Sequence, residues 1–318
     1  MSKILITGAT GFVGHAVCKK LREDGHMLTG TTRTPDQGAG PERVPLYHIP
    51  KNGTDTDWSQ AVSGADIVIH LAARVHVMKD RSPNPLADYR SVNTEGTRKL
   101  AQQAAAAGVQ RLVFISTIKV AGENSPASGF NEDDPPMPED PYGVSKWEAE
   151  QALADISRST SLEVVILRPP LVYGPGVKGN FLSLFEAINK NRVLPLGAIQ
   201  NHRSFLSVFN LADAIATAAE HPNAAGQTFF VADEHAISTP DLVRKIAAAL
   251  DTKPRLINFP LGLLKIAGFL TGKSAAVQRV AGSLTVNTRR IQTQLNWHPP
   301  VLMEDGLKET ADWFKSKK

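Results

Sequence analysis

Cysteine is nearly absent from this sequence, since Cys18 is the only one among 318 residues. A single thiol cannot form an internal disulfide, and it argues against a cysteine-ligated metal site. We therefore predict no metal centre and a cytoplasmic location. The first strand is predicted to begin at the third residue, so we expect no secretory signal.

Long apolar runs and dense clusters of one charge are also missing. The most apolar late stretch, residues 260–270, is far shorter than the roughly 20 residues of a membrane-spanning helix and contains Lys265. We expect it to be a packing helix, with no stable membrane insertion. The net charge of +4 is spread along the chain without a Lys/Arg run. This excludes the usual electrostatic pattern of a nucleic-acid-binding protein and favours a small anionic ligand.

What the sequence does contain is a regular alternation of strand-like and helical segments. The predicted strands are residues 3–7, 27–31, 67–71, 111–116, 164–167 and 228–231. The predicted helices are residues 15–24, 87–107, 145–157, 181–189 and 239–250. This alternation predicts an α/β fold with a Rossmann-type, doubly wound parallel sheet.

The domain organisation follows from where that alternation loosens. Residues 1–170 should form an NAD(P)-binding domain, with a return to the sheet around residues 205–235. Residues 171–318 should form mainly a smaller substrate-binding lobe that closes over the ends of the strands. Segment 123–141 is rich in Pro, Asp and Glu, so we expect an exposed loop there.

Three glycines follow the first predicted strand, in the segment Gly8-Ala-Thr-Gly11-Phe-Val-Gly14. Gly8 permits a tight turn, Gly11 lets a pyrophosphate approach the main chain, and Gly14 lets helix and strand pack closely. The backbone N–H groups at Phe12 and Val13 would then meet a diphosphate at the positive end of the helix. The spacing differs by one residue from G-x-G-x-x-G, so the interpretation depends on the surrounding βαβ pattern.

A tyrosine and a lysine one helical turn apart occur in Tyr142-Gly-Val-Ser-Lys146. They share a helix face, and a neighbouring ammonium would lower the tyrosine pKa from near 10 towards the working pH. Such a pair can exchange a proton with a sugar or alcohol oxygen. A purely structural helix pair is the alternative. Ser116 and Thr117 end another apolar strand, where open α/β sheets place reacting groups.

These motifs, in this order, resemble the extended short-chain dehydrogenase/reductase family of nucleotide-sugar epimerases, dehydratases and reductases. The matching segments are residues 8–14, 70–73, 92–97, 116–117, 142–146, 167–176 and 203–205. The strongest resemblance is to bacterial 4-keto reductases that form UDP-N-acetylquinovosamine, and UDP-hexose 4-epimerases look similar. Related enzymes dimerise through two helices, so the resemblance implies a homodimer formed by helices 87–107 and 145–157.

The resemblance also implies a role for individual residues. Thr117 would hydrogen-bond the reacting sugar oxygen, Tyr142 would be the acid/base, and Lys146 would also hold the nicotinamide ribose. The other implied cofactor contacts are Gly8, Gly11, Phe12, Val13, Gly14, Thr32, Arg33, Leu71, Ala72, Ala73 and Asn93. The implied contacts to a UDP-linked sugar are Arg74, Ser116, Thr117, Asn180, Arg203 and Arg279.

Some positions depart from the family pattern or stay ambiguous. His76 is either a second base or, more simply, a residue lining a loop. Leu171 stands where relatives often have an asparagine that contacts the diphosphate. Segment 48–51 lacks the acid that many relatives direct at the adenine.

The end of the second strand bears on the cofactor. NAD-dependent members usually carry an acid there, whereas this chain has Thr32 and Arg33 with no carboxylate before Asp36. A guanidinium can hold a 2′-phosphate, which favours NADP(H), with NAD(H) as the alternative.

The cofactor in turn bears on the reaction, because a reductase draws on an NADPH pool while an epimerase retains its NAD. We therefore predict reduction of the 4-keto group of a UDP-linked N-acetylamino-6-deoxyhexose for surface polysaccharide synthesis. The alternative is 4-epimerisation of UDP-glucose or UDP-N-acetylglucosamine. A non-catalytic dinucleotide sensor is disfavoured because the acid/base pair is present. An enzyme of lipid-linked sugars has only the apolar helix in its favour.

Overall fold

The central feature of the computed structural model, which describes residues 1–34, 40–75, 82–272 and 274–317, is a seven-stranded sheet. Its strand order is β10-β6-β5-β4-β1-β2-β3, and every neighbouring pair is parallel. The strands are β1 Lys3–Thr7, β2 Met27–Thr32, β3 Leu46–His48, β4 Ile67–His70, β5 Arg111–Ile115, β6 Glu163–Arg168 and β10 Thr228–Phe230. This is the predicted doubly wound fold, and its strand order reverses between β1 and β4, where such sheets bind dinucleotides.

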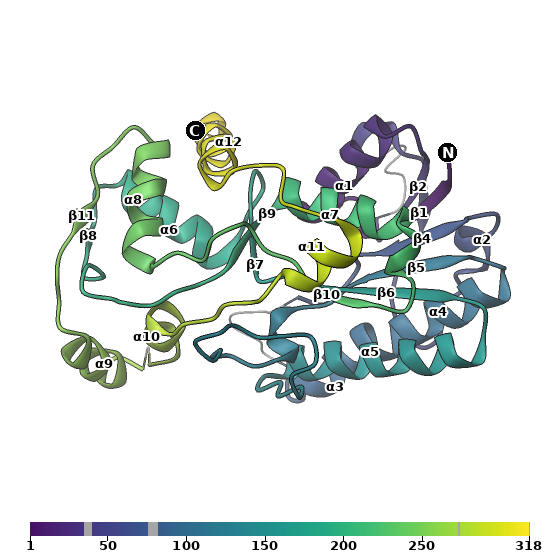
Figure 1. Cartoon of the computed structure of the whole chain (residues 1–318), viewed down its shortest axis with the longest axis horizontal. Helices are drawn as coiled ribbons and strands as arrows, with labels where there is room; N and C mark the ends of the chain where they lie inside the picture. The colour runs from purple at the N-terminus through teal and green to yellow at the C-terminus, as the bar shows by residue number, and fades with distance from the viewer. Residues whose placement is uncertain (35–39, 76–81, 273, 318) are drawn as a thin grey trace.

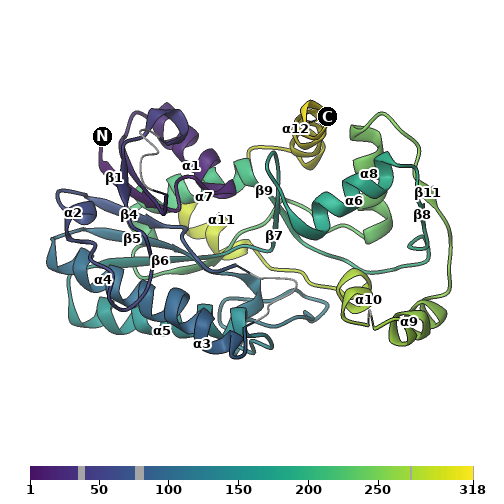
Figure 2. The same cartoon turned by 180° about the vertical axis from the view of Figure 1, so that it is seen from behind.

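Helices cover both faces of this sheet (Figures 1 and 2). One face carries α1 Phe12–Glu23, α7 Val208–Glu220 and α11 Arg289–Leu295. The other carries α2 Ser59–Val62, α4 Gly96–Ala106 and α5 Pro141–Ser159. The strands bury apolar side chains on both faces, as expected where helices cover a parallel sheet from both sides.

A smaller lobe is built from the C-terminal half of the chain (Figure 1). Its helices are α6 Gly179–Asn189, α8 Thr239–Ala249, α9 Leu261–Leu270, α10 Ser274–Ala281 and α12 Met303–Ser316. Two short sheets pair β7 Leu171–Tyr173 with β9 Phe205–Ser207, and β8 Val193–Leu194 with β11 Arg255–Leu256. Its core contains a cluster of aromatic rings that includes Phe181, Phe185 and Phe314.

The predicted helix 87–107 is interrupted. Two α-helices, α3 Pro85–Tyr89 and α4, flank a π-helical turn over Arg90–Glu95. Asn93 and Thr94 on this turn are both buried and both bond Ser145 of α5. A π-turn rotates the side chains that follow it, and such turns concentrate at functional sites.

The start of α5 and the loop before it also differ from expectation. The helix begins at Pro141 because the carboxylate of Asp140 accepts a hydrogen bond from Gly143 N–H at 2.6 Å. The expected exposed loop 123–141 is partly buried. Phe130 is inside, and the Glu132 carboxylate accepts a hydrogen bond at 2.9 Å from Phe230 N–H on the edge strand β10. An edge strand leaves N–H groups unpaired, so a neighbouring carboxylate stabilises it.

The apolar helix α9 forms where predicted, but it does not pack as expected. Leu263, Ile266, Phe269 and Leu270 are 52% to 77% exposed. The helix lies at an outer corner of the smaller lobe beside α10, and little of the chain is near it (Figures 1 and 2). No helix among the described residues combines the length and the hydropathy that crossing a membrane requires.

Candidate active site

The turn between β1 and α1 has the geometry of a diphosphate cradle. Gly8 has a φ of +71°, and a Cβ added there would lie 3.0 Å from the backbone nitrogen of Ala72. A Cβ on Gly14 would collide with the carbonyl oxygen of Gly8. Gly11 is the N-cap of α1 and brings no side chain to the first turn, so the N–H groups at Phe12 and Val13 are open to an anion. These residues therefore fit the diphosphate of a dinucleotide.

The segment after β4 closes one side of this cradle. Leu71 and Ala72 pass directly over Gly8, and Ala72 N–H donates to the hydroxyl oxygen of Thr7 at 3.1 Å. The buried His70 ring lies between the hydroxyls of Thr7 and Thr97, at 2.6 and 2.9 Å. Burial, with a smaller effect from the charge of Lys146, lowers the pKa of His70 to about 3. A neutral histidine thus joins β1, β4 and α4 behind the cradle, a role that the sequence analysis missed although it quoted this residue.

At the end of β2, Thr32 is buried and Arg33 is exposed. Their contact with an adenosine ribose stays a prediction. Asp36 and His76, which the sequence analysis also considered, lie outside the described residues.

Tyr142 and Lys146 occupy the first turns of α5, as predicted. Lys146 is 2% exposed, and its Nζ lies 3.8 Å from the centre of the Phe114 ring, the residue that pairs with His70 across the sheet. Burial lowers the pKa of Lys146 to about 7, against an opposing effect of the Glu150 carboxylate. The lysine therefore titrates near neutral pH.

The pKa of Tyr142 corrects the sequence argument, which expected the lysine to make this phenol acidic. In the chain by itself the pKa of Tyr142 is raised, first by burial and then by the charges of Asp140 and Tyr89. The Tyr89 ring meets the Tyr142 ring edge-on, with ring centres 6.0 Å apart. Burial favours the neutral phenol over the phenolate, and the negative charges of the neighbouring groups act in the same direction. Without ligands Tyr142 is therefore protonated.

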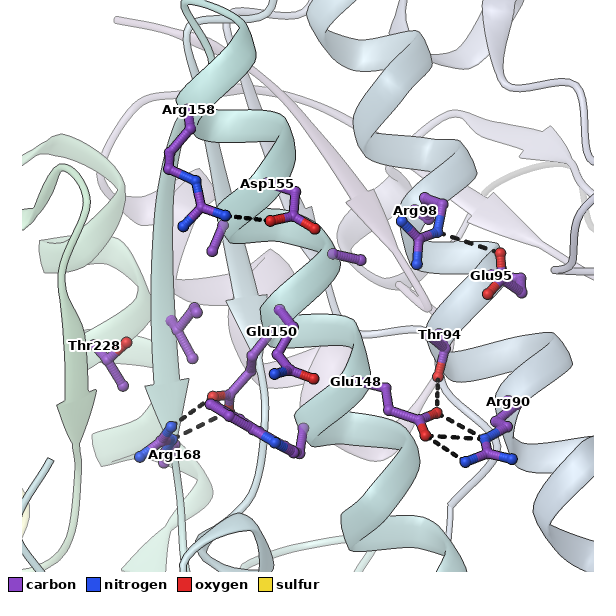
Figure 3. A pocket seen from close by; sticks show the side chains of 15 residues that line it. Arg90, Thr94, Glu95, Arg98, Glu148, Glu150, Asp155, Arg158, Arg168 and Thr228 are labelled. Atoms are coloured by element: carbon purple, nitrogen blue, oxygen red, sulfur yellow. Dashed lines mark hydrogen bonds and ion pairs between the residues drawn. The ribbon is translucent and has the colours of Figure 1, made fainter. Parts of the chain in front are cut away.

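A buried ion pair supports the end of β5. Arg168, the last residue of β6, donates from Nε and Nη2 to the two carboxylate oxygens of Glu150, at 3.1 and 2.6 Å (Figure 3). The Ser116 hydroxyl also donates to Glu150. Ser116, predicted to contact the substrate, thus directs its proton into the protein. Thr117 is the N-cap of the turn that follows, and its hydroxyl oxygen accepts a hydrogen bond from Lys119 N–H at 3.3 Å. Its contact with a sugar oxygen stays a prediction.

The first turn of α5 is held in place from a second direction. The Asn93 amide accepts a hydrogen bond from Arg74 N–H at 2.8 Å and donates to the Ser145 hydroxyl at 2.9 Å. Asn93 was predicted to touch the cofactor, and in the structure its amide bonds other parts of the chain. The Ser145 hydroxyl in turn donates to the Tyr142 carbonyl oxygen at 2.8 Å, so Asn93 supports the turn that carries Tyr142. The Lys119 ammonium contacts the helix-capping Asp140 at 2.5 Å, a contact that the sequence analysis did not anticipate.

Three of the predicted substrate contacts belong to the smaller lobe. The Arg203 guanidinium donates to the carbonyl oxygens of Arg279 and Gly282, at 2.8 and 3.0 Å, so it supports the backbone at the C-terminal end of α10 rather than presenting these donors to a ligand. The Nε of Arg279 is buried and has no hydrogen-bond partner among the described residues. Asn180 is exposed at the start of α6. An unpartnered buried guanidinium nitrogen favours a missing anionic ligand near Arg279.

The model of the NAD dependent epimerase/dehydratase family matches residues 4–232. The chain belongs to this family. This match confirms the resemblance to the extended short-chain dehydrogenase/reductase family that the motifs indicated.

Individual members of the NAD-dependent epimerase/dehydratase family are similar over nearly the whole chain. A UDP-glucose 4-epimerase of Vibrio cholerae is 42% identical, covering 98% of this chain and 95% of its own. The N-acetyl-α-D-glucosaminyl-diphospho-ditrans,octacis-undecaprenol 4-epimerase of Escherichia coli O157:H7 is 28% identical, covering 87% and 83%. A short-chain dehydrogenase/reductase superfamily protein of Agrobacterium tumefaciens, solved with bound NAD, is 25% identical with a TM-score of 0.78, covering 99% and 98%.

Proposed function

We propose that this protein is a nucleotide-sugar 4-epimerase that acts on UDP-glucose or UDP-N-acetylglucosamine and retains NAD. The observation that carries the proposal is the 42% identity to the Vibrio cholerae UDP-glucose 4-epimerase along both chains. The placement of Thr117, Tyr142 and Lys146 beside the glycine cradle supports it. These relatives favour the epimerase alternative over the 4-keto reductase prediction.

The residues divide the work of epimerisation between them. The Gly8–Gly14 turn would hold NAD, which would supply the hydride acceptor and donor that epimerisation at C4 of the sugar requires. Tyr142 accepts the proton of the 4-hydroxyl and later gives it back, while Thr117 hydrogen-bonds the same oxygen. Lys146 holds the nicotinamide ribose. The pKa of Tyr142 must fall when ligands bind, and a positively charged oxidised nicotinamide nearby has the required sign.

Reduction of a 4-keto sugar is the second candidate, and one observation favours it. Thr32 is buried and Arg33 exposed at the end of β2, with no acid at either position for an adenosine ribose. A guanidinium suits a 2′-phosphate, so the two candidates differ in cofactor as well as in reaction.

One experiment separates the two functions. Purified protein is denatured to measure released NAD, and the native protein is incubated with UDP-glucose or UDP-N-acetylglucosamine without added reductant. The proposal expects released NAD and NMR signals of the matching galacto-configured product. The reductase would be favoured if the protein released no NAD and gave no product signals. It would then oxidise NADPH only when a UDP-4-keto-6-deoxy-N-acetylhexosamine is supplied.

We further propose a homodimer formed through α5 and the α3–α4 segment. A groove of about 770 Å³ runs between these helices and is lined by the ion pairs Arg90–Glu148, Arg98–Glu95 and Arg158–Asp155 (Figure 3). Both signs of charge alternate along the groove, so two copies related by a twofold axis can place opposite charges together. Light scattering coupled to gel filtration tests this, and a monomer at all concentrations would contradict it.

A further inference from the structure

Lys119 lies between the two elements that carry the proposed catalytic groups. It belongs to the turn that Thr117 caps, and its backbone N–H donates to the Thr117 hydroxyl oxygen. Its carbonyl oxygen lies against the first turn of α5, since a Cβ added to Gly143 would come within 2.9 Å of it. The main chain of Lys119 therefore contacts both the threonine turn and the helix that carries Tyr142.

The side chain of Lys119 makes the same connection through charge. Its ammonium contacts one carboxylate oxygen of Asp140 at 2.5 Å and the Glu123 carboxylate at 2.7 Å. The other carboxylate oxygen of Asp140 accepts the Gly143 N–H that caps α5. Burial lowers the pKa of Lys119, but the bonds to Asp140 and Glu123 raise it by more, so the lysine is charged at neutral pH. A cation on the threonine turn thus neutralises the carboxylate at the start of the helix.

The carboxylate of Asp140 acts on Tyr142, which stands two residues further along the chain. Burial raises the pKa of the Tyr142 phenol most, and the charge of Asp140 raises it further. Among the described residues, the phenol is also near Tyr89, whose ring lies under the Arg74 guanidinium, and Lys146 follows it by one turn of α5. Asp140 is the carboxylate in this set, so its neutralisation bears directly on how readily the phenol ionises.

We propose that Lys119 is a positioning residue that promotes the proton exchange of Tyr142 by balancing the charge of Asp140. The ammonium reduces the negative charge beside the phenol, so less work is needed to form the phenolate. The same residue holds the turn of Thr117 against the start of α5. This inference rests on the proposed function, in which Tyr142 exchanges the proton of the sugar 4-hydroxyl.

The charges of the cluster supply a set of variants that tests the proposal. Lys119, Asp140 and Glu123 together carry one net negative charge. Lys119→Met leaves two negative charges, Asp140→Asn leaves none, and the double variant again has one. Asparagine caps a helix as well as aspartate does, so Asp140→Asn keeps the start of α5. The double variant therefore restores the wild-type charge without the lysine.

The pH dependence of kcat is the first measurement. In Lys119→Met, the limb of the profile that follows Tyr142 ionisation should move to higher pH by about one unit. It should move to lower pH in Asp140→Asn and return to the wild-type position in the double variant. Lys119→Arg keeps the cation and should keep the wild-type limb.

Lys20→Met is the matched control. Lys20 lies on α1 and also contacts two carboxylates, those of Asp24 at 2.8 Å and Asp213 at 3.4 Å. Its loss should leave the limb where it is in the wild type. Thermal unfolding of every variant is recorded as well, because a purely structural defect lowers stability and the rate at every pH without moving the limb.

A second measurement needs no turnover. NMR of protein whose tyrosines carry carbon-13 at the phenol carbon reports the ionised fraction of Tyr142 at a fixed alkaline pH, with NAD and UDP present. Tyr142→Phe identifies the signal. We expect a larger ionised fraction in Asp140→Asn than in the wild type, and a smaller one in Lys119→Met. If the wild type lacked epimerase activity, the proposed function would fail, and this measurement would still decide the role of Lys119.

Three results would overturn the proposal. One is a limb that does not move in Lys119→Met, and another is an equal ionised fraction of Tyr142 in Lys119→Met and the wild type. The third is a double variant that keeps the shift of Lys119→Met, because Lys119 would then act without Asp140.

Discussion

Arg168 and Glu150 form a two-pronged ion pair that is almost completely buried beneath the end of β5, at 4% and 3% exposure (Figure 3). The pair spans β6 and α5, and it also receives the Ser116 hydroxyl. It therefore links the segment that follows β5, which contains Ser116 and Thr117, to the helix that carries Tyr142 and Lys146. The ion pair thereby fixes the relative position of the residues that we propose as catalytic groups.

Removing one partner of this ion pair should destabilise the folded protein. Glu150→Ala leaves the Arg168 guanidinium buried without its counter-charge, and we expect the free energy of unfolding to fall by about 3–5 kcal/mol. Urea titration of the intact protein measures the change. Asp155→Ala is the control on the same helix, because it breaks the exposed pair with Arg158 and should leave stability nearly unchanged. Equal losses in the two variants would contradict this role.

The buried His70 predicts a specific acid sensitivity. Its pKa is about 3 in the folded chain, below the usual value of 6.5, so the unfolded chain binds the extra proton first as the pH falls. The effect of His70 on the free energy of unfolding is absent above about pH 6.5 and grows as the pH falls towards about 3. At about pH 4 it lowers the free energy of unfolding by roughly 3 kcal/mol. We expect the drop in unfolding free energy between about pH 7 and about pH 4 to shrink in His70→Gln.

The control for that experiment is His235→Gln, since His235 is 80% exposed. It should keep the full wild-type pH dependence. An unchanged pH dependence in His70→Gln would show that the buried ring is not the group that titrates.

Arg279 should contribute to binding the diphosphate of the substrate. Its buried, unpartnered Nε gains a charged hydrogen bond when an anion binds. We expect Arg279→Gln to weaken UDP binding, measured by calorimetry, by roughly 10- to 100-fold. Arg255→Gln removes an exposed cation from the same segment and should leave UDP affinity as it is. Equal affinities in Arg279→Gln and wild type would exclude Arg279 from the diphosphate site.

The sequence predicted the parts of the molecule that depend on local pattern. Strand and helix periodicity identified six of the seven sheet strands. β3 was missed because none of its three residues is fully buried, so its sequence has no apolar run, whereas the equally short edge strand β10 buries two phenylalanines. The glycine spacing placed the cradle correctly, since Gly8 and Gly14 are required by backbone geometry within one short segment.

What the sequence did not predict depends on contacts between distant segments. Burial of Tyr142 beside Tyr89 raises its pKa, and the spacing to Lys146 carries no information about that burial. Arg203 bonds a backbone 76 residues away, so its side chain could not be assigned from its own neighbours. The apolar composition of α9 predicted burial, but Leu263, Ile266, Phe269 and Leu270 are more than half exposed, because α9 lies at an outer corner of the smaller lobe.

The central claim is that the Tyr142 phenol exchanges the proton of the sugar 4-hydroxyl, and Tyr142→Phe tests it most directly. NMR is used to follow interconversion of UDP-glucose and UDP-galactose, and of the corresponding N-acetylhexosamines. We expect the rate to fall by roughly 10²- to 10⁴-fold, with bound NAD and thermal stability unchanged. A variant that retains turnover within a few-fold of wild type would contradict the account.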